Sequence, residues 1–452
     1  MGIIDDSIDS AFNSAIRTIG IIGRAAFSLT GKIASEVQTA RKFHKAAKAS
    51  TQNRSVFIAP GMNKNLLLLN DDPAYDDVKV KNLSWLDYIY PEDETLGNLI
   101  ISGGTDRERS KAFMPFIMEA QKNNIPVIAI HNNNHELEKI LQGYSHEVQI
   151  ISQGNRNLYF NIFGGLKTDD IVRLLVKSLD DEPEHGFESL LRALIEFMLL
   201  RDGTISLHNM AAFSINNFTT ELQTNYDDRL INKYEYDEIM NLYKAGSASR
   251  ETLKRFLKDL CNEFEAVFGT ISLRKKSSVR KILNDKGIVI FNAGNGVNEK
   301  STELMINYLL MLQMQGFVFN ILIDKFPVYK FPKFRELLRG CNFSLGHKDF
   351  IASLSGGDED LFNELTSGST AVIFRHTGES CREWSEYLGT YQKLKAKTSI
   401  GQSGGIFDFN PSKNTEDEEQ EKPRISPATI SRLPDSTACI LKYHEIFIAN
   451  IS

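Results

Sequence analysis

The stretch NLIISGGTDRERSKAF, residues 98–113, has the layout of a strand that runs into a phosphate-binding loop. Its apolar residues 99–101 predict a buried strand, Gly103 and Gly104 follow them, and Ser110 stands in a segment with helical periodicity. Strand, glycine turn and helix in this order are typical of nucleotide sites, because loop N–H groups and a helix N-terminus hold phosphate. The stretch therefore raises the hypothesis of a nucleotide site.

The phosphate-loop pattern G-x-x-x-x-G-K-[ST] fits this stretch only in part. Gly103 takes the first glycine position and Ser110 the position of the hydroxyl that holds magnesium. Glu108 replaces the second glycine, and Arg109 replaces the lysine. The candidate nucleotide-binding residues are Gly103, Gly104, Thr105, Arg109 and Ser110.

The replacements carry a physical cost for a nucleotide. Glu108 at a glycine position with positive φ would cost roughly 1–2 kcal/mol. Asp106 and Glu108 would each repel a phosphate by roughly 2–3 kcal/mol at ~6 Å and an effective dielectric constant near 20. Both acids instead complement the dipole of the helix that follows. A working nucleotide site, a former one and an ordinary strand-to-helix turn all stay open.

A second element of a nucleotide site is an apolar strand that ends in aspartate. FNILID, residues 319–324, fits this description, and Asp324 is the candidate magnesium ligand together with Ser110. Lys325 stands where a glutamate that activates water is expected. The alternative is that Asp324 caps the following turn.

Composition and charge limit the classes of function. The chain has 452 residues, enough for two or three domains, and its 42% apolar and 24% charged residues are ordinary for a globular protein. A net charge of -6 provides no global basic field for nucleic acid, so any such contact needs a local patch. The densest patch beyond the N-terminal segment comprises Arg274, Lys275, Lys276, Arg280 and Lys281. The four cysteines form no CxxC pair, which indicates a reducing compartment and argues against a zinc site.

Periodicity divides the chain into six segments. Residues 1–50 are predicted as a basic amphipathic helical segment, which either packs on the protein or on a neighbouring subunit, or lies on a membrane surface. Strands alternate with helices in 51–167 and again in 283–400, which predicts the two parts of one α/β domain with a mostly parallel sheet. An all-helical insertion, 168–282, separates them. Residues 401–427 are predicted as an acidic flexible linker, and 428–452 as strands that close the sheet.

The order of these elements resembles the HerA/FtsK superfamily of P-loop motor ATPases, and within it the coupling proteins of type IV secretion and conjugation. Four stretches carry the resemblance, which covers about residues 50–452. They are LIISGGTDRERSKAFMPFIMEAQKNNIPVIAIHNNNHEL (99–137), FRELLRGCNFSLGHKDFIASL (334–354), TAVIFRHTGESCREWSEYLGTYQ (370–392) and EKPRISPATISRLPDSTACIL (421–441). The resemblance implies a RecA-like P-loop nucleotide-binding fold with an all-helical inserted domain, ATP and Mg²⁺ as cofactors, and a ring-shaped oligomer.

The resemblance also assigns roles to single residues. His347 takes the place of a sensor glutamine, and Arg375 is a candidate catalytic arginine that reaches a neighbour's nucleotide. Asp324 is the other candidate catalytic residue, because it would orient magnesium. For Arg375, a surface ion pair is the alternative. The family's N-terminal membrane helices are replaced by the basic segment 1–50.

Three functions follow as alternatives. The first is a coupling-protein-like subunit with degraded ATPase motifs, which acts in assembly or substrate recruitment beside secretion or DNA-processing proteins. It would form a homo-oligomeric ring or join an active ATPase, and with a dead site it would need no cofactor. The second is an active motor with a noncanonical loop that translocates DNA or protein. The third is a structural adaptor at a membrane surface. No apolar run spans a membrane and no signal peptide is present, so we expect a cytoplasmic protein or one at the cytoplasmic face of a membrane.

Overall fold

The fold is described from a computed structural model that covers ten ranges of the chain. These are 56–68, 78–92, 94–145, 147–152, 161–179, 182–268, 279–294, 298–351, 356–402 and 411–451. The segment 1–50, predicted as helical, lies outside the described residues. Whether it packs on the protein or on a membrane therefore stays a prediction.

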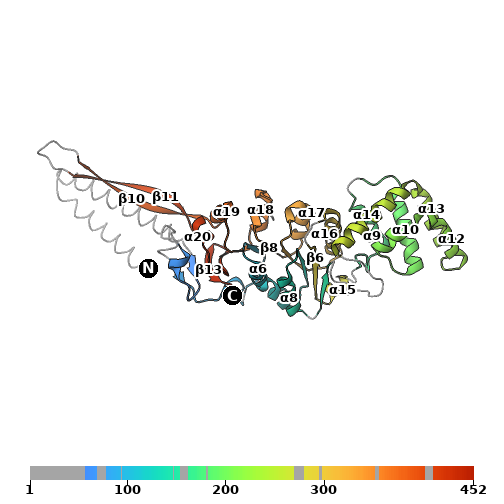
Figure 1. Ribbon diagram of the computed structural model, residues 1–452, viewed down its shortest axis with the longest axis horizontal. Helices are drawn as coiled ribbons and strands as arrows, with labels where there is room; N and C mark the ends of the chain where they lie inside the picture. The colour runs from blue at the N-terminus through green and yellow to red at the C-terminus, as the bar shows by residue number, and fades with distance from the viewer. Residues whose placement is uncertain are drawn as a thin grey trace, which may run out of the picture.

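An eleven-stranded sheet forms the centre of the molecule (Figure 1). Its order is β2-β1-β13-β12-β9-β3-β8-β7-β4-β6-β5. Strand β12 runs antiparallel to β9 and β13, whereas the other neighbouring strands are parallel. The strands are β1 (Val56–Ile58), β2 (Lys79–Val80), β3 (Leu99–Ser102), β4 (Val127–His131), β5 (Val148–Ile151), β6 (Ile288–Asn292), β7 (Asn320–Asp324), β8 (Phe343–His347), β9 (Thr370–Ile373), β12 (Thr437–Lys442) and β13 (Glu445–Asn450). The predicted α/β fold with a mostly parallel sheet is confirmed.

Helices cover both faces of this sheet. Alternate residues of one strand enter different cores: Ile100 and Ile128 face one, and Ile101 and Ala129 the other. The first core contains α16 (Glu299–Met314), α17 (Lys333–Arg339), α18 (Glu359–Thr366) and α19 (Glu379–Tyr387). The second contains α5 (Trp85–Ile89), α6 (Asp106–Ala112), α7 (Met114–Lys122) and α8 (His135–Tyr144). Burial on both faces explains why β3 and β4 are continuously apolar up to their last residue instead of alternating with polar residues.

A helical segment separates β5 from β6 in the chain and lies at one end of the molecule (Figure 1). It comprises α9 (Thr168–Val176), α10 (Phe187–Asp202), α11 (Leu207–Ala212), α12 (Phe218–Asp227), α13 (Lys233–Gly246) and α14 (Arg250–Phe268), before α15 (Val279–Asn284). Helices α10 and α13 come together at Gly186 and Gly246, where a methyl group on Gly246 would collide with the backbone of Gly186. The structure therefore contains the predicted helical block, and its description as a separate domain stays a proposal.

One expectation for the C-terminal region is wrong. The segment 401–427 is not only a linker, because β11 (Pro411–Pro423) pairs with β10 (Thr390–Gln402) in a long antiparallel hairpin. This hairpin extends from the end of the molecule opposite the helical segment (Figure 1). The predicted C-terminal strands correspond to β12 and β13, which lie in the sheet between β9 and β1. Their sequences show burial, but burial does not reveal which strand will be the neighbour.

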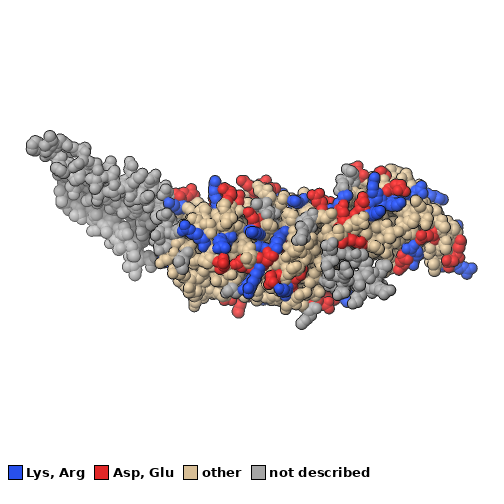
Figure 2. Space-filling model, in the orientation of Figure 1, with Lys and Arg blue, Asp and Glu red and all other residues tan. Residues whose placement is uncertain are grey.

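Charges of both signs are interspersed over the face seen in Figure 2. Of the basic patch, residues 274–276 lie outside the described ranges, and Arg280 donates to the Gly165 carbonyl and lies over the Phe317 ring. Arg280 thus has a structural role, and nucleic-acid contact by this patch stays a prediction. Among the described residues, no helix combines the length and apolar character that crossing a bilayer requires.

Candidate functional site

The turn after β3 is built by two glycines and a capping box. Gly103 and Gly104 have φ of 83° and 72°, a region that suits residues without a Cβ. Thr105 is the N-cap of α6: its side chain accepts from the Glu108 N–H, and the Glu108 carboxylate accepts from the Thr105 N–H at 2.7 Å. Glu108 lies inside the helix, so the backbone strain expected for a glycine position does not arise. Its carboxylate instead satisfies the helix start that would otherwise attract an anion.

Arg109 turns its guanidinium inward from α6 and is 1% exposed. Its Nε donates to Asp324 Oδ1 at 2.8 Å, and its Nη1 donates to the Gly104 carbonyl at 2.7 Å. Its Nη2 donates to Asp106 Oδ1 at 2.6 Å. The side chain that stands in for the phosphate-loop lysine therefore binds the protein's own oxygens.

Asp324, at the end of β7, is fully buried, and both of its oxygens accept hydrogen bonds. Asn134, the N-cap of α8, donates to Oδ2 at 2.6 Å while Arg109 binds Oδ1. Ser110 donates its hydroxyl to the Asp106 carbonyl at 2.6 Å and also bonds to Asn134. The two predicted magnesium ligands are thus brought near one another through Asn134, with their polar atoms already engaged by protein groups.

Lys325 completes the arrangement with an ion pair from Nζ to Asp106 Oδ2 at 2.5 Å. Charges of opposite sign therefore alternate along Lys325, Asp106, Arg109 and Asp324, which we call the loop ion-pair network. The inner pair is buried, while the Asp106 side chain is 39% exposed. Two acids and two bases leave the network with no net charge.

The residues present do not fit ATP with Mg²⁺. The Gly103 and Thr105 N–H groups, which would cradle phosphate, donate to the His347 carbonyl and to Glu108. The guanidinium of Arg109 is bonded to carbonyl and carboxylate oxygens, and Asp324 has no oxygen without a hydrogen bond. Nucleotide entry would have to break several of these bonds at once.

A cavity of about 670 Å³ lies beside the loop, at the carboxyl ends of β3, β8 and β9. His347 and Arg375 both line it, so the structure brings these predicted residues near Gly104 and Thr105. Arg375 pairs with Asp435 at 3.0 Å, which is the surface ion pair given as its alternative role. Burial lowers the pKa of His347, which outweighs the opposing effect of the nearby Asp324 carboxylate. A sensor role for His347 and a role for Arg375 at a neighbour's nucleotide stay predictions.

Ser102, the last residue of β3, is fully buried, and its hydroxyl oxygen has three hydrogen-bonding neighbours. Its oxygen accepts from the Trp384 indole N–H at 3.0 Å and from the Phe350 N–H at 3.3 Å. His376 Nε2 lies 2.9 Å from the same hydroxyl oxygen. Ser102 thus connects the end of β3 to Trp384, Phe350 and His376 by hydrogen bonds.

Glu138 of α8 forms a second polar cluster over the ends of β4 and β6. It accepts from Asn292 Nδ2 at 2.8 Å, and its oxygens lie 3.4 Å from His131 Nε2 and 3.1 Å from His135 Nδ1. Burial by itself raises the pKa of Glu138, but the nearby His131 imidazole and the hydrogen bonds with His135 and Asn292 outweigh it and lower the pKa to about 2. The carboxylate therefore stabilises the fold as an anion.

This arrangement predicts a pH effect on stability. The unfolded pKa of a glutamate is about 4.3, so the stabilisation by Glu138 is complete above that pH and disappears as pH falls towards 2. We expect Glu138→Gln to remove on the order of 2 kcal/mol of the acid-dependent stability, measured by urea unfolding at a series of pH values. Glu136→Gln is the control, since Glu136 is exposed and pairs with exposed Lys139. An equal acid slope in parent and Glu138→Gln would contradict this assignment.

Three members of the site were not among the predicted site residues. They are Asn134, which binds Asp324, and Asp106 and Lys325, which form an ion pair with each other. Asn134 could have been found, because an asparagine before a helix with Glu136 in its first turn is an N-cap signal. The pairing of Asp106 with Lys325 has no local signal, since 219 positions separate the two residues.

The site lies at the carboxyl ends of a mostly parallel α/β sheet, where proteins of this architecture place ligands. In structure, the chain is similar to the bacterial conjugative coupling protein TrwBdeltaN70, with 12% identity, a TM-score of 0.47, and coverage of 78% of this chain and 84% of that one. It is also similar to plasmid coupling protein TrwB in complex with ADP and Mg²⁺, with 13% identity, a TM-score of 0.44, and coverage of 78% and 84%. VirB4 of Thermoanaerobacter pseudethanolicus gives 8% identity, a TM-score of 0.43, and coverage of 78% and 89%. No protein-family model and no curated protein sequence matches the chain.

Proposed function

We propose that this chain is a coupling-protein-like subunit of a secretion, conjugation or DNA-translocation machine whose nucleotide site has become a structural ion-pair network. In this proposal it acts in assembly or substrate recruitment and does not hydrolyse ATP. The observation that carries the absence of hydrolysis is the buried pair between Arg109 and Asp324, 2.8 Å apart. The kind of machine rests on the motif order in the sequence.

The changes from the phosphate-loop pattern compensate one another, which supports a rebuilt site over simple decay. Arg109 in place of lysine supplies several donors, which reach Asp324, Asp106 and the Gly104 carbonyl. Asp106, which stands where the loop GGTGSGKS of the family that the chain resembles has a glycine, supplies the acid between Arg109 and Lys325. Lys325 in place of a glutamate supplies the last cation. Each replacement therefore has a partner among the others.

The proposed partners follow from a subunit without its own energy supply. It would join a ring of identical chains or of active ATPase subunits, with secretion or DNA-processing proteins as neighbours, at the cytoplasmic face of a membrane. Co-purification with tagged candidate subunits would test this arrangement.

We expect millimolar ATP with Mg²⁺ to leave the melting temperature of the full chain unchanged. A ligand at one hundred times its dissociation constant would add about 2.7 kcal/mol, an effect that is readily visible in a thermal melt. The matched comparison is the quadruple variant Asp106→Gly, Glu108→Gly, Arg109→Lys and Lys325→Glu, which restores the loop pattern and opens the network. We expect this variant, if folded by circular dichroism, to gain a nucleotide-dependent shift.

The opposite result would favour the alternative of an active motor with a noncanonical loop. A saturable shift in the parent chain that Arg109→Ala abolishes, together with ATP turnover lost in the same variant, would overturn the proposal. Equilibrium dialysis with labelled ATP checks the absence of a shift independently, because it measures binding without reference to stability.

A further inference from the structure

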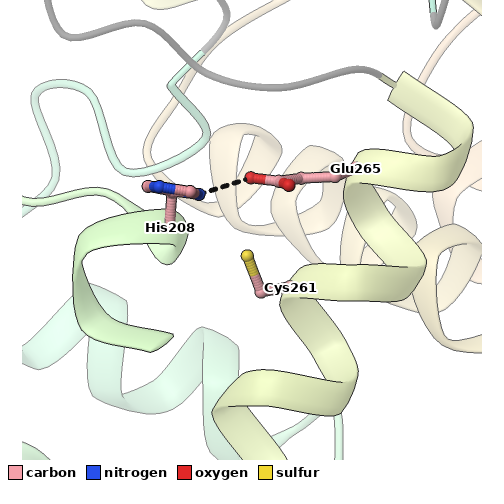
Figure 3. Close-up of side chains that lie close together, drawn as sticks. All are labelled: His208, Cys261 and Glu265. Atoms are coloured by element: carbon pink, nitrogen blue, oxygen red, sulfur yellow. Dashed lines mark hydrogen bonds and ion pairs between the residues drawn. The ribbon is translucent and has the colours of Figure 1, made fainter. Parts of the chain in front are cut away.

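Three potential metal-ligating side chains meet in the helical segment, far from the loop ion-pair network. His208 lies on α11, and Cys261 and Glu265 lie one turn apart on α14 (Figure 3). One ligand atom from each residue lies within 4.8 Å of the others. We propose that these three side chains form a Zn²⁺ site that joins α11 to α14.

The chemistry of the set suits zinc. Zn²⁺ takes thiolate, imidazole and carboxylate ligands at about 2.0–2.3 Å, so neighbouring ligand atoms of a tetrahedral site lie roughly 3.3–3.8 Å apart. The present separations, which run from 2.8 Å between His208 and Glu265 to 4.8 Å at most, need only small side-chain adjustments. Softer thiolate and imidazole ligands also exclude Mg²⁺ and Ca²⁺, which prefer oxygen alone.

The surroundings permit an ion to enter and be held. Cys261 is 5% exposed, and its sulfur points towards the space between the other two side chains (Figure 3). Glu265 is partly buried, whereas the His208 side chain is 47% exposed and can rotate. The site is thus open on the histidine side, where a water molecule can take the fourth position.

Local geometry already selects this face of α14. Cys261 and Glu265 are four positions apart, which places both side chains on one side of the helix. Without metal, Glu265 accepts a hydrogen bond from His208 at 2.8 Å, and the Cys261 sulfur lies within 4.8 Å of both groups. Zinc binding releases the thiol proton to solvent and replaces the His208–Glu265 hydrogen bond by coordination bonds.

An exposed histidine–carboxylate pair is by itself common on helices. His135 and Glu138 form such a pair on α8, at 3.1 Å. Among the described residues, this pair is not part of a cluster of three potential metal ligands. His135→Ala is therefore the matched control for adventitious zinc binding by a surface histidine.

The test is a titration of the chelator-treated full chain with Zn²⁺ and with Co²⁺. We expect saturation at one ion per chain, a higher melting temperature with Zn²⁺, and a thiolate-to-cobalt charge-transfer band with Co²⁺. Cys261→Ala should abolish that band, and His208→Ala should weaken metal binding about tenfold or more. His135→Ala should leave the cobalt band and the metal affinity unchanged.

Two outcomes would overturn the site. One is the absence of saturable binding in the parent chain. The other is binding that survives in both Cys261→Ala and His208→Ala with the same affinity. Because His208 is exposed, its substitution keeps the test valid even if Cys261→Ala, a change in the core, disturbs folding.

Discussion

Asp324→Ala should lower the free energy of unfolding by about 3–5 kcal/mol, because it leaves the Arg109 guanidinium buried without its main counter-charge. Both side chains of this pair are at most 1% exposed, so water cannot replace the lost carboxylate. Asn134 would lose an acceptor too, although its amide also bonds to Ser110. Denaturant unfolding followed by circular dichroism measures the change.

Two matched variants separate the buried pair from the rest of the loop ion-pair network. Asp106→Ala should cost only roughly 1 kcal/mol, since Asp106 is partly exposed and salt bridges near solvent contribute little. The double replacement Arg109→Met with Asp324→Leu should be close to the parent or more stable, because it removes both charges together. A loss below about 1 kcal/mol in Asp324→Ala would contradict the buried pair, and with it the physical basis of the proposed function.

Trp384→Ala should cost a similar amount, about 3–5 kcal/mol. Trp384 on α19 is fully buried and packs against Phe350, Phe362 and Tyr387, with ring centroids 5.4–6.0 Å apart. Its removal leaves a large cavity in one core, and the Ser102 hydroxyl loses the hydrogen bond that the indole N–H donates to it. Because the variant loses a fluorophore, circular dichroism is again the measurement.

Two milder substitutions separate the contributions of packing and of hydrogen bonding to this loss of unfolding free energy. Trp384→Phe keeps most of the ring and loses the bond to Ser102, so we expect about 1–2 kcal/mol. Ser102→Ala leaves the indole N–H and the Phe350 N–H without their acceptor and should cost about 1–3 kcal/mol. The double variant should cost less than the sum of the two, since both remove the same bond. Full additivity would show that the Ser102–Trp384 bond contributes nothing.

The sequence predicted those parts of the protein that depend on local pattern. Continuous apolar runs such as residues 99–101 and 321–323 belong to strands buried on both faces, and their alternation with helices predicts a parallel sheet. The helices between β5 and β6 follow from their apolar periodicity in the same way. Gly103, Gly104 and Thr105 likewise predict a turn and a helix start, and the structure has both.

The order of the strands in the sheet and the pairing of the C-terminal strands could not be predicted from local sequence patterns. Burial of β12 and β13 is visible in their residues, but the choice between an edge and a central position depends on hydrogen bonds to distant strands. The acidic run in 411–423 has a composition typical of a linker, and only the opposite strand, β10, makes it part of a hairpin.

The sequence by itself determined the α/β architecture, the helical block and the phosphate-loop-like turn, because periodicity and turn chemistry act over a few residues. Only the tertiary structure decided what the turn does. Arg109 follows β3 and Asp324 ends β7, and β8 lies between these strands, so their contact joins residues 215 positions apart. The meeting of His208 with Cys261 and Glu265 likewise required α11 to pack on α14. Charge complementarity and metal-ligand geometry depend on distances in space, which neighbours in sequence do not reveal.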